Sequence, residues 1–182
     1  MKWPNALTFI RHGQSSYNLL KKKKEEGASY HVFKELFEKE FKNATHEDWA
    51  SEELKYLARQ VWQDTKLGVS DYNTPLTEEG VRQAEETGRR LKEEAVIPEV
   101  VYVSPYLRTR QTLEGLMRGL PELKKASVVS EERIREQEHG LATIYNDWRV
   151  YFVFNPVQAL LFNLETDYEY RFLNGENKAD VR

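Results

Sequence analysis

The sequence predicts an α/β fold in three layers, with a mainly parallel central sheet flanked by helices. Short, β-prone apolar stretches alternate with amphipathic helical patterns, which is typical of parallel strands joined by helical crossovers. Functional residues in such sheets gather where the strands end at their carboxyl side. The stretches that we expect to form buried strands are Leu7–Ile10, Val100–Val103 and Ser127–Val129.

The strongest helical pattern follows Thr77, which can cap the helix with Glu78 and Glu79 in its first turn. A second helix is expected directly after Val103. Ser104-Pro105 offers a cap followed by a proline at the first helical position. The apolar positions of the first helix recur three and four residues apart, at Val81, Ala84, Gly88, Leu91 and Ala95.

The segment from Lys21 to Asn73 is too long for an ordinary connection, so we expect it to carry structure of its own. We interpret it as a helical insertion, at about 21–73, packed near the rim of the active site or remote from it. Two apolar stripes predict two amphipathic helices. They are formed by Phe33, Leu36, Phe37 and Phe41, and by Leu54, Leu57, Ala58, Val61 and Trp62.

A later stretch, Ile144–Leu164, is rich in aromatic residues and leucine and is interrupted at Asn155-Pro156. A proline breaks a helix because it lacks an N–H and clashes with the preceding turn. We interpret the stretch as a pair of lid or cap helices. The alternative is that both helices pack in the core without gating anything.

Composition sets further bounds. The 182 residues suit one domain with a sizeable core, and the net charge of -3 gives no basic field that would attract nucleic acid. Cysteine is absent, which excludes disulfides and thiolate metal sites. No apolar stretch approaches membrane-spanning length, and the first residues do not resemble a signal peptide. We expect a cytoplasmic protein without nucleic-acid or membrane partners.

The first expected strand ends in an Arg-His pair followed by glycine and small polar residues. The planar guanidinium of Arg11 suits phosphate, and His12 can serve as nucleophile, acid or metal ligand. Gly13 lets the backbone approach a ligand closely, because it has no Cβ. This pattern favours a phosphate pocket with a nucleophilic histidine, and its neutral donors are Gln14, Ser15 and Asn18.

The run Arg11–Ser15 with Asn18 resembles the signature of the histidine phosphatase (phosphoglycerate mutase-like) superfamily. Four later blocks are similar to those of the same family, in the same order. The resemblance implies one histidine phosphatase domain over residues 1–182. The later blocks are Pro75–Gly80 with Gln83-Ala84, Val103–Arg108 with Gln111-Thr112, Ile134–Gly140, and Gly175–Asn177 with Asp180-Val181.

The resemblance implies a phosphomonoesterase that works through a phosphohistidine on His12 and acts on a small phosphorylated substrate. Negative charge on the transferring phosphoryl group calls for fixed cations around it. Arg11 supplies one guanidinium. Arg108 occupies the family's Ser-Pro-x-x-Arg position for another, with Arg110 as the local competitor.

The departing oxygen needs a proton, which a carboxylic acid can supply. Glu136 and Glu138 face opposite ways if their segment is extended, and Glu136 matches the proton donor of the family. His139 is interpreted as a packing or rim residue. His31 and His46 lie in the insertion, and no histidine or carboxylate grouping there has metal-ligand spacing. We therefore expect no metal, and no cofactor is implied.

The family also places a second histidine after a later strand, and nothing in this sequence matches it. Either these residues belong to a longer enzyme, or the protein is naturally short and catalytically impaired. In both cases we expect weak or no turnover, an exposed sheet edge, and self-association into homo-oligomers. The alternatives to a phosphatase are a phosphoglycerate-type mutase and a non-catalytic phospho-ligand-binding protein.

Overall fold

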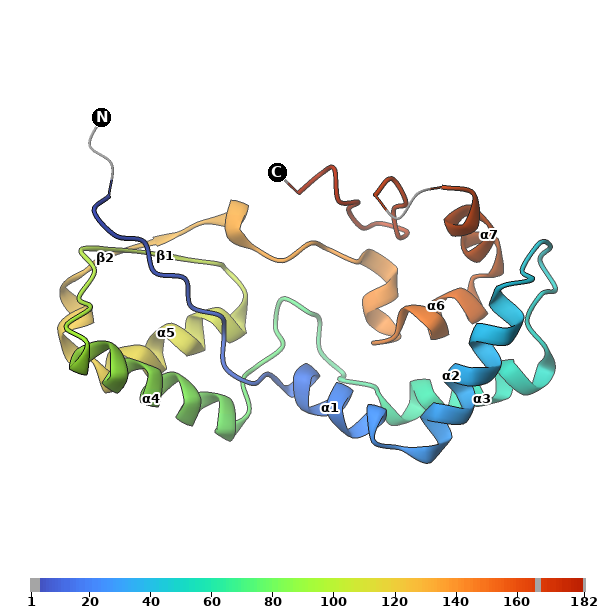
Figure 1. Ribbon diagram of the computed structural model, residues 1–182, viewed down its shortest axis with the longest axis horizontal. Helices are drawn as coiled ribbons and strands as arrows, with labels where there is room; N and C mark the ends of the chain where they lie inside the picture. The colour runs from blue at the N-terminus through green and yellow to red at the C-terminus, as the bar shows by residue number, and fades with distance from the viewer. Residues whose placement is uncertain (1–3, 166–167, 182) are drawn as a thin grey trace. The chain divides into compact units, whose positions relative to one another are not determined.

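Helices make up most of the regular structure in the computed structural model, which describes residues 4–165 and 168–181 (Figure 1). The chain divides into two units, and each is described by itself. The first unit contains Met1–Ser15 and Pro75–Glu131, and the second contains Ser16–Thr74 and Glu132–Arg182.

The first unit contains a parallel pair of strands, β1 (Val100–Val103) and β2 (Ser127–Ser130). Helix α5 (Leu107–Gly119) and the short 3-10 helix η1 (Pro121–Lys125) connect them. Val100 lies opposite Ser127, and the register continues to the end of both strands. The crossover predicted between these two apolar stretches is therefore confirmed.

Helix α4 (Glu78–Glu93) also has the cap predicted for it. The Thr77 hydroxyl accepts a hydrogen bond from the Gly80 N–H at 3.0 Å, while Glu78 and Glu79 complement the positive end of the helix dipole. The helix runs beside α5 (Figure 1). A leucine-rich core lies in this unit, and its buried members are Leu113, Leu116, Leu120 and Leu123.

Helix α5 begins later than predicted. Its first residue is Leu107, so the cap expected at Ser104-Pro105 is wrong. The buried Ser104 hydroxyl has no hydrogen-bond partner among the described residues. The Ser104 carbonyl instead accepts a hydrogen bond from the Thr109 hydroxyl at 2.6 Å. A turn therefore separates β1 from α5, and Arg108 still lies in the first helical turn.

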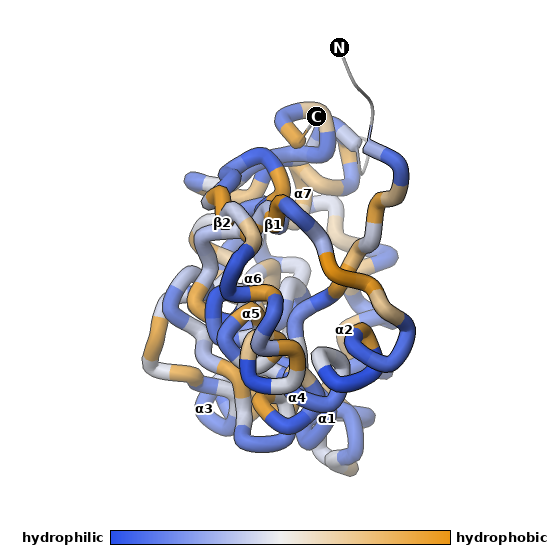
Figure 2. Tube along the Cα trace, turned by 90° about the vertical axis from the view of Figure 1, so that its left-hand side faces the viewer, coloured by the Kyte–Doolittle hydropathy of each residue, from blue (hydrophilic) through white to orange (hydrophobic). Residues whose placement is uncertain are grey.

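The buried strand predicted at Leu7–Ile10 is wrong. The segment has no regular structure, and the side chain of Phe9 is 87% exposed. An apolar stretch becomes a strand only when a neighbour satisfies its backbone groups. Within the described residues the sheet has two strands, and the side chains of Val100 and Tyr102 in β1 are exposed. Figure 2 colours the chain trace by the hydropathy of each residue and labels both strands. The described chain is thus mainly helical with a small two-stranded parallel sheet. The prediction of a three-layer fold around a mainly parallel central sheet is corrected accordingly.

The second unit is helical and holds an aromatic core. Phe33, Phe37, Tyr151 and Phe152 are almost completely buried in it. Its α-helices are α1 (Ser16–Glu25), α2 (Ala28–Phe41), α3 (Glu52–Asp64), α6 (Trp148–Phe154) and α7 (Pro156–Leu164), and its 3-10 helices are η2 (Glu132–Ile134) and η3 (Gly140–Ile144).

Both helices predicted in the insertion are confirmed as α2 and α3, and the predicted break at Asn155-Pro156 separates α6 from α7. The core that α2 and α3 build also takes in residues of α6 and α7. Core packing therefore accounts for the buried apolar residues of α2, α3 and α6, whereas Val157, Leu161 and Leu164 of α7 are exposed.

A buried ion pair ties α1 to the start of α6. Lys24 Nζ lies 2.6 Å from a carboxylate oxygen of Asp147, and the Tyr30 hydroxyl donates to the same carboxylate at 2.7 Å. Asp147 also caps α6 by accepting the Arg149 N–H at 2.8 Å. Burial opposes ionisation of Asp147, but the charge of Lys24 and these hydrogen bonds bring its pKa below the ordinary value.

We predict that Asp147→Asn lowers the free energy of unfolding by about 3–5 kcal/mol, because it leaves Lys24 buried without its counter-charge. Urea unfolding followed by tryptophan fluorescence measures the change. The matched control is Glu52→Gln, which removes an exposed pair with Lys55 and should cost less than about 1 kcal/mol. Equal effects of the two substitutions would contradict a structural role for the buried pair.

Candidate active site

Hydrogen bonds anchor the segment that carries His12 to the first turns of α5. The Gly13 N–H donates to the Thr112 hydroxyl oxygen at 3.2 Å, and that hydroxyl donates to the Arg108 carbonyl at 2.7 Å. One buried side chain, Thr112, therefore links the residue after His12 to the backbone of Arg108.

The next residue, Gln14, is anchored to α4. Its N–H donates to the side-chain oxygen of Gln83 at 2.9 Å, and its carbonyl accepts the Thr77 N–H at 2.9 Å. The Thr77 hydroxyl donates to the Gln14 side-chain oxygen, also at 2.9 Å. Ser15 then forms an antiparallel bridge with Leu76. The backbone that follows His12 is thus anchored to α5 through Gly13 and to the start of α4 through Gln14.

The anchoring brings two backbones together at Gly13 and Gly80. A Cβ built on Gly13 would lie 2.3 Å from the Gly80 carbonyl oxygen, and one built on Gly80 would lie 2.1 Å from the Gln14 carbonyl oxygen. No other residue type fits such an approach. The sequence predicts that Gly13 lets the backbone approach a ligand, whereas in the structure the absent Cβ allows the His12 segment to pack against α4.

The hydrogen bond of the His12 ring defines its chemistry. Nδ1 lies 2.7 Å from the Gly13 carbonyl oxygen, and the ring is half-buried. A carbonyl oxygen only accepts, so Nδ1 must carry the proton of this bond. The neutral ring then has its lone pair on Nε2, which is the form that a nucleophilic histidine requires.

The two candidate arginines of α5 differ in burial. Arg108 is 4% exposed, and its guanidinium carbon lies 4.4 Å from the centroid of the Tyr106 ring. Arg110, two residues later, is exposed. Burying a guanidinium is costly unless negative charge or acceptors surround it. Burial thus distinguishes Arg108 as the better candidate for an anion site.

The predicted site residues fall in both units. Those of the first unit are Arg11, His12, Gly13, Gln14, Ser15 and Arg108, and the hydrogen bonds above bring the His12 segment next to the turn of Arg108. Ser15 is buried, which favours a structural role for it over contact with substrate. Asn18, in α1, and Glu136, after η2, belong to the second unit.

Sequence reasoning assigned no role to the side chains that hold the segment in place. Thr112 and Gln83 contact it directly, and the Gln111 side-chain oxygen accepts the Leu76 N–H at 2.8 Å. All three stand in the blocks that resemble the family, so the signal was present. The sequence alone does not show that these positions face the His12 segment.

Across 4–165 and 168–181, no cluster of three or more histidine and carboxylate side chains could hold a metal ion. No helix in those ranges combines the length and the apolar character needed to span a membrane.

The family model for the histidine phosphatase superfamily (branch 1) matches residues 58–182, more than half of the chain. The chain therefore belongs to the histidine phosphatase superfamily. The matched range includes Arg108 and Glu136, whereas His12 precedes it. The assignment of His12 thus depends on its own motif and geometry.

Particular relatives are phosphoglycerate mutase-like proteins of Arabidopsis thaliana. The chain is 35% identical over 123 residues to the protein AT74H and 36% identical over 120 residues to AT74, each match covering 61% of this chain. The matches span 41% and 35% of those relatives, well under half of their length. A solved structure named as a phosphohistidine phosphatase, SixA of Agrobacterium tumefaciens, is 20% identical with a TM-score of 0.35, covering 40% of this chain and 46% of that one.

We predict that Gly80→Ala displaces the His12 segment, because the new Cβ would collide with the Gln14 carbonyl. Overpacking of this kind costs about 1–3 kcal/mol of stability. Chemical unfolding gives the stability loss, and backbone amide NMR shifts of Gly13 and Gln14 report the displacement. Arg90→Ala, on the exposed face of α4, is the control and should leave those shifts unchanged. Unchanged Gly13 and Gln14 shifts in Gly80→Ala would contradict the contact.

Proposed function

We propose that this protein cleaves phosphate monoesters through a phosphohistidine formed on Nε2 of His12. The observation that carries the proposal is the hydrogen bond from Nδ1 to the Gly13 carbonyl, which leaves the lone pair on Nε2. Membership of the histidine phosphatase superfamily supports the same class of chemistry. A covalent intermediate divides one difficult displacement into two easier ones.

In the first step the Nε2 lone pair forms a bond to phosphorus while the bond from phosphorus to the ester oxygen breaks. The oxygen leaves as an alcohol after taking a proton from a carboxylic acid. In the second step water attacks phosphorus, returns a proton to the carboxylate, and frees the histidine. Arg11 and Arg108 would offset the charge of the phosphoryl oxygens, and Gln14 and Asn18 would add neutral donors.

Glu136 is the proposed proton donor. Its side chain is exposed, and it lies between η2 and η3, where the backbone has no regular secondary structure. Glu138 is also exposed, and its N–H and carbonyl are both bound to Glu176. Glu136→Gln and Glu138→Gln therefore form a matched pair, and only the former should slow hydrolysis.

A mutase is the second candidate, because the relatives in Arabidopsis thaliana are named as phosphoglycerate mutase-like. A mutase passes the phosphoryl group from histidine to another hydroxyl, whereas a phosphatase passes it to water. Comparing the release of inorganic phosphate with phosphoryl transfer to an added sugar acid separates the two functions.

We predict that His12→Ala abolishes acid-labile labelling of the protein by a ³²P-labelled phosphate monoester. Phosphohistidine forms only on an imidazole nitrogen, so no label should remain. His46→Ala is the matched control, because His46 lies on the exposed loop between α2 and α3. Equal labelling of His12→Ala and the unaltered protein would show that His12 is not the nucleophile.

We predict that Arg108→Ala weakens binding of inorganic phosphate about 10- to 100-fold, as expected for loss of a charged hydrogen-bond donor. Isothermal titration calorimetry measures the affinity. Arg110→Ala, the exposed neighbour, should change the affinity less than about twofold. The reverse order of effects would assign the phosphate site to Arg110.

A further inference from the structure

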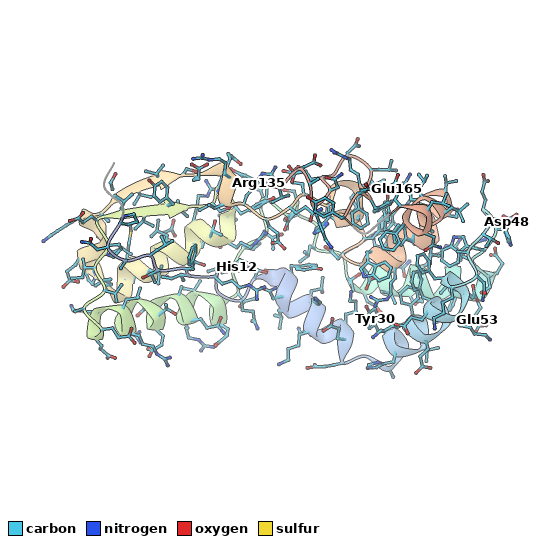
Figure 3. The ribbon with its side chains drawn as sticks, turned by 45° about the horizontal axis from the view of Figure 1, so that its top comes forward. His12, Tyr30, Asp48, Glu53, Arg135 and Glu165 are labelled. Atoms are coloured by element: carbon cyan, nitrogen blue, oxygen red, sulfur yellow. The ribbon has the colours of Figure 1, made fainter. Side chains whose placement is uncertain are left out.

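A bidentate ion pair holds the chain on the N-terminal side of Glu136. Arg135 Nη1 lies 2.8 Å from Oε2 of Glu176, and Nη2 lies 2.5 Å from Oε1. Both side chains are about three-quarters buried. Such two-point pairing fixes direction as well as distance. Figure 3 labels Arg135, which follows η2 directly.

The same glutamate holds the chain on the other side of Glu136. Oε2 of Glu176 accepts the Glu138 N–H at 2.9 Å, and the Glu176 N–H donates to the Glu138 carbonyl at 2.7 Å. The Gln137 side-chain amide donates to the Glu176 carbonyl at 2.6 Å. Arg135 also donates to the carbonyl of Glu136 itself at 3.0 Å. The residues on both sides of Glu136 are thus bound to one residue far away in the sequence.

The packing behind these bonds is close. A Cβ built on Gly175 would lie 2.8 Å from the Glu138 carbonyl oxygen. Gly140 has a φ of +50°, and a Cβ built on it would lie 2.2 Å from the Leu173 carbonyl oxygen. The Leu141 N–H donates to that same carbonyl at 2.8 Å. The two segments are therefore in backbone contact over several residues.

Glu176 remains charged over the whole neutral range. The hydrogen bond from Arg135, followed by that from the Glu138 N–H, lowers the pKa of Glu176 to about 2. A lowered pKa means that the contact stabilises the folded state above the ordinary pKa of the carboxyl group. This contribution is lost as the pH falls from there toward 2.

We propose that Glu176 is a positioning residue for the proton donor Glu136. The inference rests on the proposed function, because it gives Glu136 its role. No helix or strand fixes the described backbone between Ile134 and Gly140, so the hydrogen bonds of Glu176 supply the constraint. A displacement of about 1 Å in a catalytic group lowers the rate by about 100-fold. Glu176 acts through Glu136 and need not touch the substrate.

The test compares substrates that differ in their need for a proton. The 4-nitrophenolate of 4-nitrophenyl phosphate is a weak base and leaves without help, whereas the oxygen of phenyl phosphate needs protonation. Loss of a general acid should slow phenyl phosphate about 100-fold or more and the nitrophenyl ester little. We expect this pattern for Glu136→Gln and, to a smaller degree, for Glu176→Gln. The measured quantity is the rate at which His12 becomes phosphorylated in a single turnover of the intact protein.

The control is Glu132→Gln, since the exposed Glu132 also approaches Arg135, at 3.8 Å, but binds none of the residues 136–138 by a described hydrogen bond. It should leave both substrates unaffected. Combining Glu136→Gln with Glu176→Gln should cost no more on phenyl phosphate than Glu136→Gln alone, because both remove the same proton transfer. Glu176→Asp keeps the charge and should recover part of the rate.

The outcomes separate this inference from the proposed function. If Glu136→Gln slows both esters equally, the proton-donor role of Glu136 is wrong. Suppose instead that Glu136→Gln shows the expected pattern. If Glu176→Gln then slows both esters equally, or slows neither of them, the positioning role of Glu176 is wrong. Hydrogen exchange tests the contact between the Glu138 amide and Glu176 independently of turnover. We expect this amide to exchange faster in Glu176→Gln than in Glu132→Gln. Unchanged exchange would overturn the inference even in an inactive protein.

Discussion

The hydrogen bond between Nδ1 of His12 and the Gly13 carbonyl is the interaction on which the proposed chemistry depends. It determines which ring nitrogen holds the proton, and therefore which one can attack phosphorus. A neighbouring residue can serve as acceptor only if its backbone is fixed. That rigidity comes from α4 and α5, through Thr77, Gln83 and Thr112.

The two units hold their candidate residues in different ways. The first holds the nucleophile and a buried arginine at the start of a helix, both anchored by neutral hydrogen bonds. The second holds Glu136, whose backbone is constrained by a charged pair. The difference is physically reasonable. A nucleophile must stay neutral beside its acceptor, whereas an exposed loop needs stronger bonds to hold its shape.

The sequence predicted those parts of the fold that local physics decides. Thr77 caps α4 because its hydroxyl accepts an N–H that has no partner within the helix, and Pro156 cannot continue α6 but can begin α7. The strand at Leu7–Ile10 could not be predicted correctly in this way. A strand depends on a partner elsewhere in the chain, and side-chain composition does not reveal whether one is present.

The candidate site shows the same limit. Its candidate reactive residues could be proposed from the sequence, because an Arg-His pair followed by glycine is chemically distinctive. The supporting contacts could not, because they join residues far apart in the chain, as Gln14 joins Gln83 and Glu138 joins Glu176. Gly13 illustrates the gap, since its missing Cβ suits a ligand and a helix backbone equally well.

Long-range ¹H–¹⁵N NMR of the histidine rings near neutral pH examines the central requirement directly, with His12→Gln used to assign the resonances. We expect the neutral His12 ring to be protonated on Nδ1, with an unprotonated Nε2 and a Nδ1 proton shifted downfield by its hydrogen bond. A ring protonated on Nε2 would contradict the role assigned to this histidine.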